Sequence, residues 1–151
     1  MRLDLDHVIS RPVEAVFAFM ADVRNRPLWQ ENTRDVELLT EGEPGLGSRW
    51  RETVKGIGTY EAEVVAFERD ALWSEAADLD AGSGRITVTF APGAGEEPAT
   101  RVGITVEITL RGTRRLMEPA LGPMIRRQMP SDLARLEALL GERGGNGDPA
   151  P

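Results

Sequence analysis

The sequence contains no cysteine and has only one histidine, one lysine and one tyrosine among its 151 residues. Without cysteine there can be no disulfide, no thiolate nucleophile and no cysteine-ligated zinc. The acidic residues do not have the spacing of a calcium loop, and the chain has no phosphate-binding P-loop, no GxSxG motif and no dinucleotide fingerprint. We therefore expect no metal site and no cofactor.

Long apolar runs and an excess of positive charge are also missing. No unbroken apolar stretch approaches the roughly 18 residues that cross a membrane, and Asp4 and Asp6 lie where a signal peptide would need apolar side chains. The 25 acidic residues exceed the 18 basic ones, and the net charge of −7 argues against nucleic-acid binding. We expect a cytoplasmic protein without stable membrane insertion, and we leave a homodimer open.

Alternation of apolar and polar residues with a period of two predicts a protein rich in β-strands. The alternation begins at Leu3, Leu5, His7 and Ile9, and it returns after two short helices. Turns rich in glycine and proline separate the later strands, which favours an antiparallel meander with one solvated and one covered face. The expected strands are residues 3–9, 36–38, 47–55, 59–68, 72–79, 85–91 and 101–110, and the expected short helices are residues 13–21 and 22–29.

The last third of the chain changes to helical spacing. Apolar residues recur at this spacing from residue 114 to residue 140, despite Pro119, Pro123 and Pro130, and predict one long amphipathic helix. We expect Gly141 to end this helix, and we expect residues 141–151 to form a disordered tail because they are polar and rich in glycine and proline. Residues 1–140 then form a single domain.

Five segments in this order resemble the START and Bet v-type superfamily (SRPBCC proteins), in its polyketide cyclase/dehydrase-like branch. ISRPVEAVF at residues 9–17 is similar to the strand, proline and helix that open this fold, and DVRNRPLW at residues 22–29 to its second short helix. GLGSRW at residues 45–50 resembles its glycine-rich entry to the third strand. TRV at residues 100–102 resembles the start of its last strand, and LARLEALL at residues 133–140 the end of its long helix.

The resemblance covers residues 2–140 and implies an α+β helix-grip fold, in which a seven-stranded antiparallel sheet wraps around a long C-terminal helix. Between them this fold encloses a cavity for a hydrophobic small molecule. The family has no universal catalytic motif, so three hypotheses for the function stay open. The first is binding of a hydrophobic or aromatic molecule, lipid- or polyketide-like. The second is a polyketide cyclase/dehydratase-type enzyme, and the third is a protein-interaction module of the chaperone-activator kind.

Strand parity predicts which side chains would line such a cavity. In the strand at residues 59–68 either parity is possible, because a β-bulge would exchange the two faces. The aromatic side chains on the inward face form either a platform for a flat ligand or ordinary core packing, and the methionines of the long helix suit varied ligands. The expected ligand-binding residues are Trp29, Trp50, Tyr60, Trp73, Glu75, Phe90, Val106, Met117, Leu121 and Met124.

His7 and Glu52 are the candidate catalytic residues, because parity places both on the inward face. An imidazole beside a carboxylate can act as a general acid or base near neutral pH. The alternative is a histidine near a strand end with no chemical role. A buried carboxylate is costly unless it is paired, so Glu52 and Glu75 must find a partner, take up a proton or contact water in the cavity.

Overall fold

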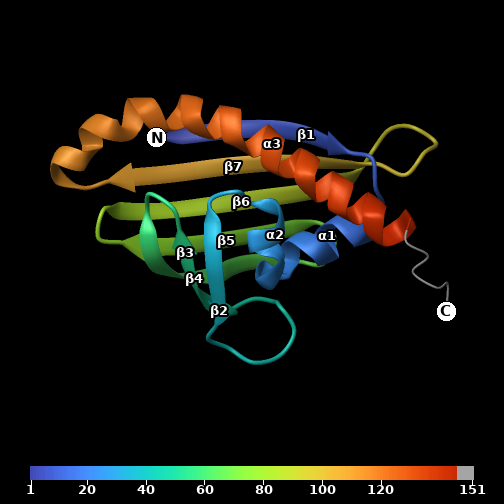
Figure 1. The fold of residues 1–151 in the computed structure, drawn as a ribbon, viewed down its shortest axis with the longest axis horizontal. Helices are drawn as coiled ribbons and strands as arrows, with labels where there is room; N and C mark the ends of the chain where they lie inside the picture. Colours follow the sequence, from blue (N-terminus) through green and yellow to red (C-terminus); the bar gives the residue numbers. More distant parts are fainter. Residues whose placement is uncertain (146–151) are drawn as a thin grey trace.

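All seven strands belong to one antiparallel sheet. In the computed structural model, which describes residues 1–145, the strand order is β1-β7-β6-β5-β4-β3-β2. The first strand thus pairs with the last, and β2 to β7 form a meander (Figure 1). This confirms the predicted sheet. The strands are β1 (Arg2–Ile9), β2 (Thr33–Leu38), β3 (Arg49–Val54), β4 (Gly58–Glu68), β5 (Leu72–Leu79), β6 (Gly82–Pro92) and β7 (Thr100–Leu110).

The helices cover the inward face of this sheet. α1 (Val13–Ala21), the 3-10 helix η1 (Val23–Asn25) and α2 (Arg26–Trp29) connect β1 to β2. Figure 1 shows the long helix α3 (Glu118–Gly145) running across the sheet, where it contacts β1, β7 and α2. Pro12 precedes α1 with an extended backbone, and its fixed φ of −62° favours a helix start there.

The long helix differs from its prediction at both ends. It is preceded by a 3-10 helix, η2 (Gly112–Met117), and the α-helical part extends from Glu118 to Gly145 with Pro123 and Pro130 inside it. Gly141 does not end the helix, because its φ is not positive as that of a terminating glycine would be. Of the expected disordered tail, residues 141–145 are helical, and residues 146–151 lie outside the described residues.

Strand parity is as predicted, and a bulge resolves the ambiguous strand. Tyr60 and Val64 in the first part of β4 face inward, and the pairing register with β5 shifts between Val64 and Ala66. Beyond the shift Phe67 faces the core, where its ring meets that of Trp73 edge to face at 6.2 Å. Both parities are therefore used along one strand, which is what a β-bulge produces.

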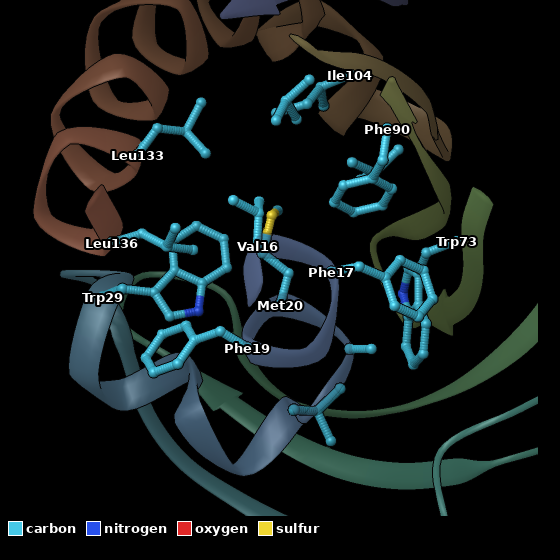
Figure 2. Packing of buried hydrophobic residues seen from close by; sticks show 14 of the residues in the cluster. Val16, Phe17, Phe19, Met20, Trp29, Trp73, Phe90, Ile104, Leu133 and Leu136 are labelled. Atoms are coloured by element: carbon cyan, nitrogen blue, oxygen red, sulfur yellow. The ribbon is translucent and has the colours of Figure 1, made fainter. Parts of the chain in front are cut away.

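The hydrophobic core lies where the helices meet the inward face of the sheet. Figure 2 shows α1, α2 and α3 contributing side chains to the same cluster as β5, β6 and β7. The ring of Phe17 packs edge to face against Phe67 at 5.6 Å and against Phe90 at 5.1 Å. Leu133 and Leu136 attach the C-terminal half of α3 to this cluster and are 1% and 0% exposed.

Candidate functional site

Two adjacent hollows lie between the inward face of the sheet and α3. We call the larger one, of about 620 Å³, the outer chamber, and the smaller one, of about 190 Å³, the inner chamber. Tyr60, Glu75 and Ile86 line both, so the two chambers meet at these side chains. The outer chamber is bordered by the β3–β4 and β5–β6 turns and by η2, and the inner chamber by α1, α2 and the middle of α3.

A buried ionic core lies beside the inner chamber. The guanidinium Nη1 of Arg26 donates hydrogen bonds to Glu52 Oε1 and Glu75 Oε1, both at 2.9 Å, and Nη2 donates to Glu75 Oε2. Arg26, Glu52 and Glu75 are 7%, 2% and 6% exposed. The sequence-based requirement that both inward glutamates find a partner is met by a single arginine.

Three aromatic side chains complete the coordination of the two carboxylates. The Tyr60 hydroxyl donates to Glu52 Oε2 at 2.8 Å, and the Trp50 indole donates to Glu52 Oε1 at 3.2 Å. The Trp73 indole donates to Glu75 Oε2 at 2.7 Å. Trp50 also has the Arg26 guanidinium over its ring, at 5.2 Å from the centroid. We call these six residues the Arg26 cluster: Arg26, Trp50, Glu52, Tyr60, Trp73 and Glu75.

The cluster fixes the protonation of two of its members. Burial acts to lower the pKa of Arg26, but the charges of Glu75 and Glu52 outweigh it, so the pKa is raised and the guanidinium stays charged. Burial raises the pKa of the Tyr60 phenol, and the negative charge of Glu52 raises it further. Tyr60 is therefore a proton donor, not a phenolate, at neutral pH.

Local structure explains how Arg26 reaches this place. The Asp22 side chain accepts hydrogen bonds from the backbone and the side chain of Arg24, and this interaction starts the η1 turn. Pro27 then occupies the first turn of α2, which brings Arg26 under the sheet and leaves Arg24 in solvent. From the opposite side, strand parity points Glu52 and Glu75 inward, where both accept hydrogen bonds from Arg26.

Two buried donors beside the inner chamber have no hydrogen-bond acceptor among residues 1–145. They are the Nε of Arg26 and the indole Nε1 of Trp29. Both residues line the inner chamber, together with Asp132 of α3, which is 6% exposed. Asp132 Oδ1 accepts from the Glu31 backbone at 3.2 Å and from Gln128 at 3.0 Å. The inner chamber thus has polar groups from both α2 and α3 in its wall, beside apolar side chains such as Val88 and Ile104.

The structure does not bring the two candidate catalytic residues together. His7 is half-buried in β1, opposite Val102 of β7, and lines neither chamber. Glu52 binds Arg26, Trp50 and Tyr60 instead. Parity correctly gave the inward direction of both side chains. The two residues nevertheless do not form a pair in this structure, because β1 and β3 lie at different places in the sheet, with four strands between them.

Most of the expected ligand-binding residues do line the chambers. The inner chamber includes Trp29, Trp73 and Phe90, and the outer chamber includes Val106, Met117 and Leu121, while Tyr60 and Glu75 belong to both. Trp50, a member of the Arg26 cluster, is buried and lines neither chamber.

Met124 was expected to bind the ligand, but it does not line either chamber. Its side chain is 57% exposed.

Sequence reasoning missed Arg26 and Asp132. A partial signal for Arg26 was present, because a cation is one of the partners that two inward glutamates can find, but Arg24 and Arg26 both lie in the same short segment and only one of them is buried. Nothing in the sequence indicated that Asp132 belongs to the site, since an acidic residue after Pro130 also suits an exposed helix start. Within the described residues, no three acidic or histidine side chains are grouped so that they could hold a metal ion.

No helix in the described part of the chain is long and apolar enough to span a membrane. Residues 2–141 match the model of a family described as polyketide cyclase / dehydrase and lipid transport. Comparison with curated proteins finds no match.

Solved structures with the same fold include the Zhui aromatase/cyclase of a Streptomyces species, at a TM-score of 0.73 and 16% identity over 98% of both chains. A conserved protein of Geobacillus kaustophilus aligns with a TM-score of 0.75 and 12% identity, over 95% of this chain and 97% of that one. Truncated norcoclaurine synthase of Thalictrum flavum aligns with a TM-score of 0.68 and 12% identity, over 93% of this chain and 92% of that one. These likenesses show a shared helix-grip fold, and the match over residues 2–141 shows that the chain belongs to the polyketide cyclase / dehydrase and lipid transport family, within the SRPBCC proteins.

Proposed function

We propose that the protein binds a hydrophobic or aromatic small molecule in the two chambers, with residues 1–140 as the ligand-binding domain. The volumes support this, because pockets for small molecules usually measure about 300 to 1,000 Å³ and the outer chamber alone has about 620 Å³. The walls are mostly apolar, with Ile86, Val106, Ile108 and Leu121 among them.

The observation that carries the proposal is the polar junction between the two chambers. Tyr60 and Glu75 lie where the chambers meet, and both are oriented by hydrogen bonds inside the Arg26 cluster. A few fixed polar groups on an apolar wall are how small-molecule sites set the orientation of a ligand. A core that served only stability would not need this arrangement, because burying charged groups is costly.

A cyclase/dehydratase-type enzyme is the second candidate, and the Tyr60–Glu52 hydrogen bond favours it. A protonated phenol that faces both chambers could donate a proton to an enolate oxygen, and a glutamate could accept one. His7 has no such position, so Tyr60 replaces it as the leading candidate for proton transfer. The presence of two chambers argues against the third hypothesis, a protein-interaction module with a filled interior.

Native mass spectrometry followed by organic extraction tests the proposal. We expect an apolar small molecule to remain on the purified wild-type protein. Ile86→Trp, which puts an indole where the chambers meet, should lose that molecule, and Arg101→Trp on the outer face of β7 should keep it. No retained mass, together with no binding of a fluorescent hydrophobic probe, would contradict the proposal. Return of the extracted molecule unchanged after incubation supports binding, whereas conversion to a product supports the enzyme.

A further inference from the structure

We propose that the inner chamber selects ligands that carry a cationic nitrogen, an ammonium group attached to an apolar or aromatic body. This inference rests on the proposed function, since it assumes that the chambers hold a small molecule. It assigns the chemical class of the group that would lie at the Arg26 cluster.

The first observation is the balance of charge. Among the described residues that line the inner chamber, three carry carboxylates, Glu52, Glu75 and Asp132, and one carries a cation, Arg26. Negative groups therefore exceed positive ones by two when all four are ionised. None of the four is more than 7% exposed, so solvent and salt screen their field only weakly. A buried excess of negative charge is costly, and a cation entering the chamber would relieve it.

The second observation is that each carboxylate still has room for a donor. A carboxylate has about four lone-pair positions. Within residues 1–145, Glu52 Oε2 accepts only from Tyr60, and Glu75 Oε1 accepts only from Arg26. The hydrogen bonds that Asp132 accepts from Glu31 and Gln128 both end on Oδ1. An ammonium group, which has up to three N–H donors, could bind these oxygens without displacing Arg26.

The third observation is that Arg26 cannot act as an anion site. Its two Nη atoms already donate to Glu52 and Glu75, and these two carboxylates more than balance its charge. The unpartnered Nε is therefore a dipolar donor inside a negative environment. It suits a water molecule or a neutral oxygen of the ligand. It would not offset the repulsion between the buried glutamates and a ligand that carries a carboxylate or phosphate.

The walls of the inner chamber also suit such a ligand. Trp29, Trp73 and Phe90 line it, and aromatic faces attract cations as well as apolar groups. The ring of Trp50 shows this interaction already within the protein, because the Arg26 guanidinium lies over it. A cation between aromatic walls and buried carboxylates would gain from both.

Three probes with the same ring system test the proposal by isothermal titration calorimetry at pH 7: 1-naphthylmethylamine, 1-naphthalenemethanol and 1-naphthoic acid. We expect the amine to bind about 10-fold more tightly than the alcohol and the carboxylate to bind most weakly, as expected for a ligand charge facing buried carboxylates. In Glu52→Gln, the affinity for the amine should fall close to the affinity for the alcohol, while the affinity for the alcohol itself changes little. Glu63→Gln, on the exposed face of β4, is the matched control and should keep the full preference.

Asp132→Asn is a second variant in case Glu52→Gln does not fold, and it keeps Oδ1 as an acceptor. It should also reduce the preference for the amine. Equal affinity of wild-type protein for the amine and the alcohol, or tighter binding of the carboxylate, would overturn the selectivity and leave the proposed function standing. Failure of all three probes to bind, together with no retained mass in native mass spectrometry, would overturn both.

Discussion

Tyr60 is the only tyrosine of the chain, so its ionisation can be followed without interference from another phenol. Burial raises its pKa, and the neighbouring Glu52 charge raises it further. We expect no phenolate absorbance at 295 nm in the folded wild-type protein near pH 10, the ordinary pKa of tyrosine. Because the pKa in the folded state is above the unfolded value, the stabilisation from this group is complete below about pH 10 and is lost as the pH rises further.

Two variants control this titration. Glu52→Gln removes the adjacent negative charge, so the phenolate should form at lower pH than in the wild type. Tyr60→Phe should give no tyrosinate signal in the same range. A midpoint near pH 10 in folded wild-type protein would show that the phenol is neither desolvated nor bound to Glu52.

At the residue scale, only part of the Arg26 cluster could be predicted from the sequence. The inward direction of Glu52 and Glu75 follows from a period of two, and the need for a partner follows from the cost of a buried charge. The identity of that partner does not follow, because Arg26 comes from a four-residue helix that is too short to have a readable periodicity. To choose Arg26 over Arg24 as the partner, one must know in which direction η1 and α2 turn the chain.

At the scale of elements, α3 is attached to the core by its C-terminal half. Leu136 is 0% exposed, whereas Leu139 is only half-buried. We expect Leu136→Ala to lower the free energy of unfolding by about 2 to 5 kcal/mol, because it leaves a cavity in the packed core. Leu139→Ala is the matched control and should cost clearly less. Urea denaturation measures both, and equal losses would mean that α3 is not anchored at Leu136.

The elements whose residues follow a regular period were predicted well, and the irregular ones were not. Alternation located the strands and their inward faces, but it could not locate the bulge between Val64 and Ala66, since both parities of β4 carry apolar residues. The error at Met124 has a similar origin. Met117 belongs to a 3-10 helix with three residues per turn, so a spacing of 3.6 cannot be carried from Met117 into α3.

At the scale of the whole molecule, the order of elements was sufficient to predict the fold, and the chambers required coordinates. The helix-grip arrangement was implied by the resemblance of this order, a β-meander, two short helices and a long final helix, to the SRPBCC proteins. Whether side chains fill the space between sheet and helix depends on the crossing of α3 over β1 and β7, which no local pattern encodes. The two chambers and their shared polar junction are therefore findings of the structure.

The uneven attachment of α3 predicts how a ligand gains access. Among residues 112–131 no side chain is fully buried, whereas Asp132, Leu133 and Leu136 are. Pro123 and Pro130 also remove two backbone donors from the helix, which weakens it further.

Segments with little buried surface open at low free-energy cost, so amides of residues 112–129 should exchange with deuterium at least about 10-fold faster than those of residues 132–142. Because Arg114, Met117 and Leu121 line the outer chamber, opening of this segment would uncover it, and a ligand in the chamber should slow its exchange. Hydrogen–deuterium exchange with and without 1-naphthylmethylamine measures both effects, and residues 132–142 serve as the internal reference. Uniform exchange along α3, or protection confined to residues 132–142, would place the entrance elsewhere.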